Sequence, residues 1–120
     1  MSNKLVVVEG CQLSFRNPQA QGIIQILPTS CPVSSGGNKA YNGQLNFVVT
    51  GYTVGQFAQS TPCPGAIPGT SQKAFSQGLA FVLDGDSVQV VIQGIENGSP
   101  SAKTDEVYVA NPGQNVLKVT

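Results

Sequence analysis

The fold prediction starts from a stretch of sequence that occurs twice. Residues 39–54 read KAYNGQLNFVVTGYTV, and residues 73–88 read KAFSQGLAFVLDGDSV. Phe47 corresponds to Phe81 at an offset of 34 (81 − 47), and a partial third copy at residues 5–13 carries the same pattern of short apolar residues followed by Gly10. Three copies of a short β unit within residues 1–120 predict a single domain with a pseudo-threefold body rather than an enzyme with one deep cleft.

The local pattern predicts an all-β chain. Fourteen Gly and eight Pro are spread so evenly that few windows could hold three helical turns. Short Val-rich and Ile-rich runs predict strands at Leu5–Val8, Ile23–Leu27, Leu45–Val49, Leu79–Leu83, Val88–Ile92, Val107–Ala110 and Val116–Val119. Asn42-Gly43 predicts a hairpin turn, and Asn111-Pro112-Gly113 predicts a turn before the last strand. Residues 55–72 and 96–105 are expected to be long loops.

Composition excludes several classes of function. Only 10% of the residues are charged and the net charge is zero, so the basic surface of a nucleic-acid-binding protein is missing. The chain has no His, which excludes His-based general base catalysis and Ser-His-Asp or Cys-His nucleophile pairs. Asp84 and Asp86 lack the further acids and the loop spacing of a calcium site. No enzyme activity is expected.

Three cysteines are the residues with the strongest case for special chemistry. Cys31 and Cys63 each precede a proline, while Cys11 follows Gly10. Burial as small apolar residues is the favoured interpretation, because free cysteine is among the most buried residue types. The alternatives are a thiolate site for zinc or iron formed by Cys11, Cys31 and Cys63, and a disulfide between Cys31 and Cys63.

The N-terminal residues MSNKLVVVEG hold an apolar run of only four residues, too short for the core of a signal peptide. An odd number of cysteines also fits a reducing compartment better than a disulfide framework. The chain is therefore expected to be made in the cytoplasm.

Two segments resemble those of the PAAR and PAAR-like spike-tip proteins. The first is Pro28-Thr29-Ser30-Cys31-Pro32-Val33 followed by Gly36-Gly37-Asn38-Lys39-Ala40-Tyr41, and the second runs from Thr61-Pro62-Cys63-Pro64 to Lys73-Ala74-Phe75. The resemblance covers roughly residues 5–95. It implies a small conical β body that caps the trimeric spike of a contractile injection machine, such as a phage tail, a tailocin or a type VI secretion system. The family's metal site of three His and one Cys cannot be carried over, because the chain has no His.

The resemblance therefore implies a non-catalytic tip that sharpens a spike for membrane puncture. Its implied partners are the trimeric spike protein, a toxin cargo and, transiently, the target membrane, within a particle that is delivered outside the cell. The alternative is another small all-β structural, adaptor or binding module of a phage-like assembly. That alternative predicts strands that close onto each other as a sandwich or barrel, without a threefold relation of the repeats.

Overall fold

The computed structural model describes residues 3–120 and is all-β throughout them, as predicted. The strands are β1 (Lys4–Leu5), β2 (Gln12–Phe15), β3 (Gln21–Ile26), β4 (Ser34–Ser35), β5 (Asn38–Lys39), β6 (Gln44–Val54), β7 (Phe57–Gln59), β8 (Cys63–Pro68), β9 (Phe75–Ser76), β10 (Leu79–Ala80), β11 (Ser87–Glu96), β12 (Ser99–Asn111) and β13 (Lys118–Val119). No helix within these residues is long and apolar enough to cross a membrane.

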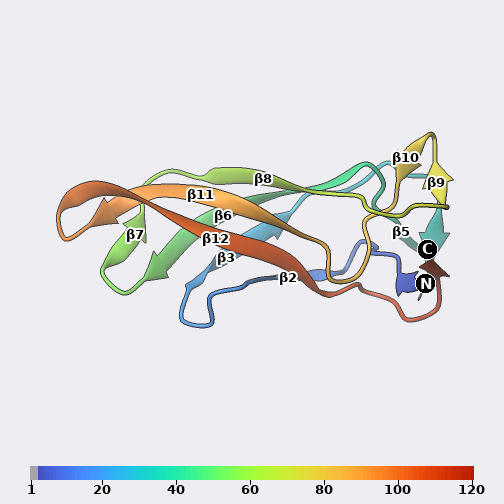
Figure 1. Ribbon diagram of the computed structural model, residues 1–120, viewed down its shortest axis with the longest axis horizontal. Coiled ribbons are helices and arrows are strands. Elements are labelled where there is room, and N and C mark those ends of the chain that lie inside the picture. The colour runs from blue at the N-terminus through green and yellow to red at the C-terminus, as the bar shows by residue number, and fades with distance from the viewer. Residues whose placement is uncertain (1–2) are drawn as a thin grey trace.

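The long strands form one seven-stranded antiparallel sheet. Its order is β2-β12-β11-β7-β6-β3, and β8 pairs with β6 beside β7. The sheet curls into a nearly closed barrel (Figure 1), which is the feature that the alternative of a structural module predicted. The molecule is elongated, with principal extents of 48 × 26 × 22 Å, and both chain ends lie at the same end of the barrel.

The barrel core follows from the alternation of side chains along each strand. In β6, Leu45, Phe47 and Val49 point inward, and the next inward residue is Tyr52, three positions later. Gly51, with φ of +66°, supplies the extra residue that changes the alternation, and the pairing of β3 with β6 shifts register there. A glycine suits this bulge because it adopts positive φ without a steric penalty.

Two segments predicted as loops are strands. Residues 55–72 contain β7 and β8, and residues 96–105 are mostly β12, which pairs with β11 without interruption from Ser99. The hairpin turn predicted at Asn42-Gly43 is also absent, because Asn42 instead makes an isolated bridge to Phe81. Within residues 3–120, the tight turns in which both residues have positive φ are Gly36-Gly37 in β4–β5, Gln77-Gly78 in β9–β10 and Asn97-Gly98 in β11–β12.

The sequence repeat at an offset of 34 does not mark equivalent elements. Phe47 lies in the middle of β6, whereas Phe81 follows the short hairpin β9–β10. Tyr41 is buried, whereas Phe75 is half exposed. The physical reason is that both segments satisfy a general strand pattern while their backbones pair with different partners. The predicted pseudo-threefold arrangement of these repeats is therefore not shown.

Candidate functional site

The barrel is closed at the end that holds the chain termini by three short extended segments, residues 6–8, 40–42 and 81–83, here called the ring. Its first set of backbone hydrogen bonds is cyclic: Tyr41 N donates to Val7 O, Val7 N to Val82 O, and Val82 N to Tyr41 O, each at 2.9 Å. Single β-bridges at Val6–Leu83, Val8–Ala40 and Asn42–Phe81 join the same segments. Each segment is thus bonded to both of the others.

A second cyclic set of hydrogen bonds repeats the same relation two residues further along. Glu9 N donates to Lys39 O, Gly43 N to Ala80 O, and Asp84 N to Leu5 O, at 2.9, 2.7 and 2.9 Å. The acceptors Leu5, Lys39 and Ala80 each lie two residues before the central residue of a ring segment. The two sets place Val7, Tyr41 and Val82 at corresponding positions.

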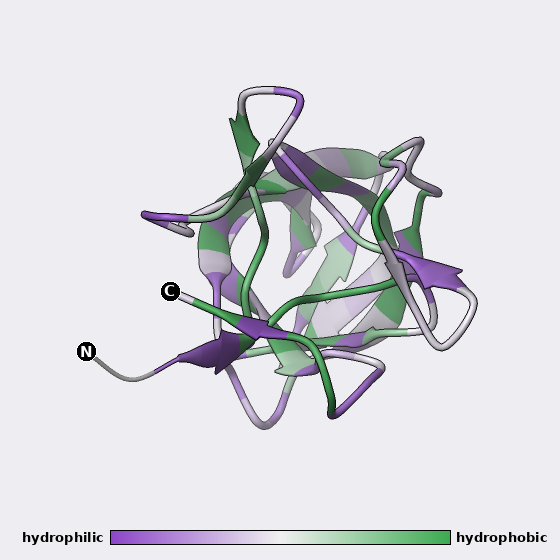
Figure 2. Ribbon diagram, turned by 90° about the vertical axis from the view of Figure 1, so that its right-hand side faces the viewer, coloured by the Kyte–Doolittle hydropathy of each residue, from purple (hydrophilic) through white to green (hydrophobic). Residues whose placement is uncertain are grey.

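Each ring segment follows a two-stranded unit. The units are β13 with β1, β4 with β5, and β9 with β10, and Figure 2 shows them projecting outward around the end of the barrel. Their registers correspond, since Leu5 pairs with Lys118, Lys39 with Ser34 and Ala80 with Phe75. Two units are hairpins, and the third is built from the two ends of the chain.

Side chains of the ring point alternately to two cores. Val7, Tyr41 and Val82 belong to the barrel core and seal its end. Their neighbours face a second core on the other side of the ring, formed by Val6, Val8, Cys31, Ala40, Phe81 and Leu83. Val33, Ala74 and Leu117, which immediately precede β4, β9 and β13, pack against this second core. The ring is therefore buried on both sides.

The unit β9–β10 differs from the other two in its outer surface. Phe75 and Leu79 are 54% and 48% exposed, and Val116, which precedes β13, is 79% exposed. Ser71 also enters this unit: Phe81 N donates to its hydroxyl at 2.7 Å, and the hydroxyl donates to Ala74 O. The corresponding bonds in the other units are direct, from Ala40 N to Val33 O and from Val6 N to Leu117 O. Apolar side chains thus remain exposed at the ring end.

The structure does not bring the three cysteines together. Cys11 lies in the barrel core, Cys31 lies in the second core with its thiol 3.6 Å from Ser76 Oγ, and Cys63 begins β8 with its sulfur 3.5 Å from Val91 O. All three are free thiols, and no group of three or more His, Cys, Asp or Glu within residues 3–120 could hold a metal ion. Burial raises the pKa of Cys11 to about 11 and also raises the pKa of Cys63. Thiolate formation is therefore disfavoured at both.

In the Asp84-Gly85-Asp86 turn, the carboxylate of Asp86 forms hydrogen bonds within the protein. The Asp86 carboxylate accepts hydrogen bonds from Thr70 Oγ1 and from Leu83 N, each at 2.8 Å, and so ties the ring segment to the start of β11. Burial raises the pKa of Asp86, more strongly than these hydrogen bonds lower it. The carboxylate works as an acceptor for local backbone and hydroxyl groups.

A buried polar pair inside the barrel escaped the sequence analysis. Tyr52 Oη donates to Asp105 Oδ2 at 2.6 Å, and Asp105 Oδ1 accepts from Glu106 N at 2.7 Å and Asn17 N at 3.2 Å. Asp105 thereby links Tyr52 on β6 to Asn17 in the turn between β2 and β3. The sequence signal for this pair is the position of Asp105, which shares one face of its strand with the inward residues Val107 and Val109.

Comparison of the chain with protein-family models, with curated proteins and with solved structures gave no match.

Proposed function

We propose that this chain is a non-catalytic tip protein that caps the trimeric spike of a contractile injection apparatus and sharpens it for membrane puncture. The observation that carries the proposal is the ring, in which three segments are joined by two cyclic sets of backbone hydrogen bonds. A monomer can match a homotrimer only if it offers three similar surfaces around one axis. The ring end offers three units with corresponding backbone registers, because one two-stranded unit precedes each ring segment, although their exposed side chains differ.

The ring end also has the surface chemistry of a docking face. Its short two-stranded units leave outer edges open for pairing with the strand ends of a β-rich spike. Phe75, Leu79 and Val116 supply exposed apolar area close to these edges. The opposite end of the barrel, at the β6–β7 and β11–β12 turns, would then point toward the target membrane (Figure 1). The low charge of the chain favours its passage, since each charge in a bilayer is costly.

The alternative function is a structural or adaptor module of a phage-like assembly. The nearly closed barrel favours it, because most of the chain is a single curled sheet without threefold repetition. In that case the ring would be an internal plug of the barrel rather than a platform. Under either function a toxin cargo is a further partner to test, and the particle acts outside the cell that makes it.

The stoichiometry of a complex with a trimeric spike protein from the same genome separates the two functions. Native mass spectrometry should find one chain per three spike subunits. The interface of that complex should bury about 1,000 Å² or more. Phe75→Asp should weaken the complex at least about tenfold by placing a charge in the docking face. Val91→Asp is the matched control, because Val91 is equally exposed (55%, against 54% for Phe75) but lies on β11 in the barrel wall. Three chains per trimer, or no complex, would favour the adaptor.

Elemental analysis of the same purified protein tests the alternative of a zinc or iron site at Cys11, Cys31 and Cys63. The proposed docking face uses Phe75, Leu79 and Val116, and none of these cysteines is part of it.

A further inference from the structure

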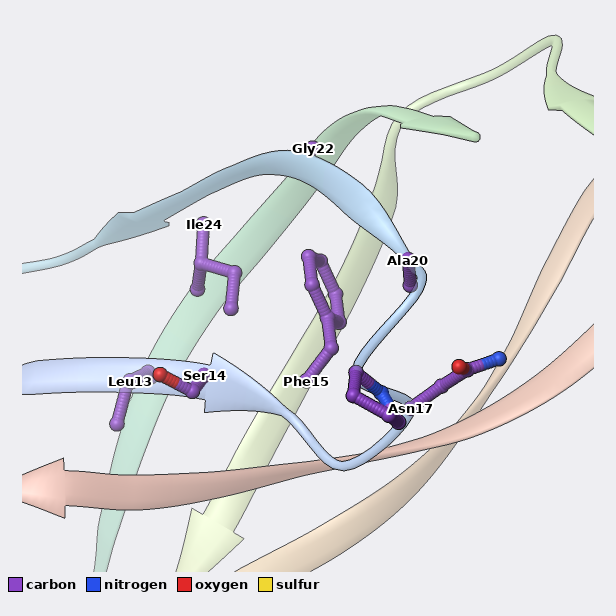
Figure 3. Close-up of a pocket in the computed structure, with 8 residues that line it drawn as sticks. Leu13, Ser14, Phe15, Asn17, Ala20, Gly22 and Ile24 are labelled. Carbon is purple, nitrogen blue, oxygen red and sulfur yellow. The ribbon is translucent and has the colours of Figure 1, made fainter. Parts of the chain in front are cut away.

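The barrel has an open seam between β2 and β3. These strands follow each other in the chain and lie at the two ends of the strand order, yet no ladder joins them within residues 3–120. Figure 3 shows the two strands splaying apart from the turn at residues 16–20, with the side chains of Phe15 and Ile24 between them. Consecutive antiparallel strands joined by so short a connection usually pair as a hairpin, so the separation needs a cause.

The seam is held open because each strand is fixed to its other neighbour. The turn is attached to β12 by Arg16 N to Glu106 O at 2.7 Å, by Asn17 N to Asp105 Oδ1 at 3.2 Å, and by the ion pair of Arg16 with Glu106 at 2.6 Å. On the other side, Gly22 lies so close to β6 that a Cβ there would be 3.1 Å from Tyr52 Cα. These attachments draw the turn toward β12 and draw β3 toward β6, so the two strands diverge.

The seam presents unpaired backbone groups on both sides. In an antiparallel ladder, alternate residues direct their N–H and C=O groups away from the partner strand. Because Leu27 N donates to Asn46 O, the outward residues of β3 are Ile24 and Ile26. Because Arg16 N donates to Glu106 O, those of β2 are Leu13 and Phe15. No partner for these four N–H groups is found among the described residues 3–120.

The two strands at the seam are uncharged. Leu13, Phe15, Ala20 and Ile24, together with the polar residues Ser14 and Asn17, line a hollow of about 300 Å³ between the strands. Neither β2 (QLSF) nor β3 (QGIIQI) carries a charge, and Ile23 on the outer face of β3 is 66% exposed. Proteins protect free strand edges with charges or prolines against added strands. An edge with neither of these residues fits an extended, uncharged segment that brings an apolar side chain to the hollow.

We propose that the seam between β2 and β3 is an acceptor site for an extended, uncharged peptide segment of a partner protein, which adds as a strand to the edge of β3. This inference rests on the seam alone and is independent of the proposed docking at the ring end. The backbone groups of Ile24 and Ile26 bond the added strand, and the hollow takes one of its apolar side chains.

Amide hydrogen exchange of the full chain tests the proposal. The probe is an acetylated and amidated peptide of alternating threonine and valine, about seven residues long. At saturation, exchange at Ile24 and Ile26 should slow by about tenfold or more. Ile23→Lys should abolish this protection, because a lysine on a free edge blocks strand addition. Ile95→Lys is the matched control, since Ile95 is also exposed but its strand pairs with Ala58 on one side and Pro100 on the other.

Three results would overturn the proposal. The first is unchanged exchange at Ile24 and Ile26 with the peptide present. The second is equal protection by a peptide whose backbone nitrogens are methylated at alternate positions, because that peptide cannot complete a ladder. The third is a dimer of the free chain, seen by sedimentation and dissolved by Ile23→Lys, which would assign the seam to a second copy of the chain.

Discussion

Replacing Tyr52 by Phe should destabilise the fold through one hydroxyl group. Tyr52 is 1% exposed, and its hydroxyl donates to the Asp105 carboxylate at 2.6 Å. A hydrogen bond to a charged acceptor contributes roughly 1.5–3 kcal/mol. Asp105 keeps its two backbone donors. A phenylalanine at position 52 also keeps the edge-to-face contacts that the aromatic side chain of Tyr52 makes with Phe15 and Phe57. We therefore expect the free energy of unfolding to fall by about 2 kcal/mol.

Thermal unfolding gives the size of the effect. An unfolding entropy of about 2.1 cal/mol/K per residue gives ~0.25 kcal/mol/K for a chain of 120 residues, so Tm should fall by about 8 °C. The matched control is Tyr108→Phe, since Tyr108 lies on the same strand as Asp105 with Arg16 4.0 Å above its ring, a contact that Phe keeps. The control should stay within about 0.5 kcal/mol of the wild type.

The pH dependence provides an independent check. Burial, and then the hydrogen bond and charge of Asp105, raise the pKa of Tyr52 above its ordinary value. The unfolded chain therefore ionises this tyrosine first, and its contribution to stability is complete below about pH 10 and is lost as the pH rises above that value. The stability gap between wild type and Tyr52→Phe, measured by urea unfolding, should narrow from pH 7 to pH 11. A gap that stays constant, or a Tyr52→Phe variant as stable as Tyr108→Phe, would refute the reasoning.

Three further predictions concern the ring, its turn and the barrel wall. Val82→Ala, which removes two buried methylene equivalents from the centre of the ring, should cost about 2 kcal/mol in urea unfolding. Burial raises the pKa of Asp86, so the folded state binds the carboxyl proton more tightly than the unfolded state does. The stability of the wild type should therefore fall as the pH rises above the ordinary pKa of a carboxyl group. Asp86→Asn should remove that fall, as measured by unfolding curves over a series of pH values. Gly94→Ala would place a Cβ 2.2 Å from Ala58 O, and should cost about 3 kcal/mol or more by the same unfolding assay.

The strand content and the main apolar strands could be predicted from the sequence, but β8 could not. Its sequence CPGAIP contains two prolines, which are typical of a loop. Pro64 and Pro68 are an even number of residues apart, so both lack an N–H on the same side of the strand. That side faces away from β6, toward β11, where no ladder forms. The even spacing of the two prolines is therefore compatible with a strand that pairs on one side only.

The segment at residues 96–105 was misinterpreted for a different reason. Its polar composition predicts a flexible loop, but the reversal takes only Asn97 and Gly98, whose positive φ values match a tight hairpin turn. The polar residues that follow belong to a strand at the far end of the barrel, where Lys103 forms an ion pair with Glu96 at 3.3 Å. The polar composition of residues 96–105 correctly indicates that many of their side chains are exposed. Exposure of side chains alone does not distinguish a strand from a loop.

The ring could not be found by aligning repeats along the chain. Val7, Tyr41 and Val82 correspond through backbone hydrogen bonds, which place no demand on side-chain identity, and their spacings differ (34 and 41 residues). The third two-stranded unit is also assembled from β1 and β13, which are separated by almost the whole sequence. A partner that bonds to backbone edges would recognise this correspondence even though the side chains differ. The hydrogen-bonding pattern of the ring therefore supports the proposed trimeric partner, whereas the sequence repeat does not.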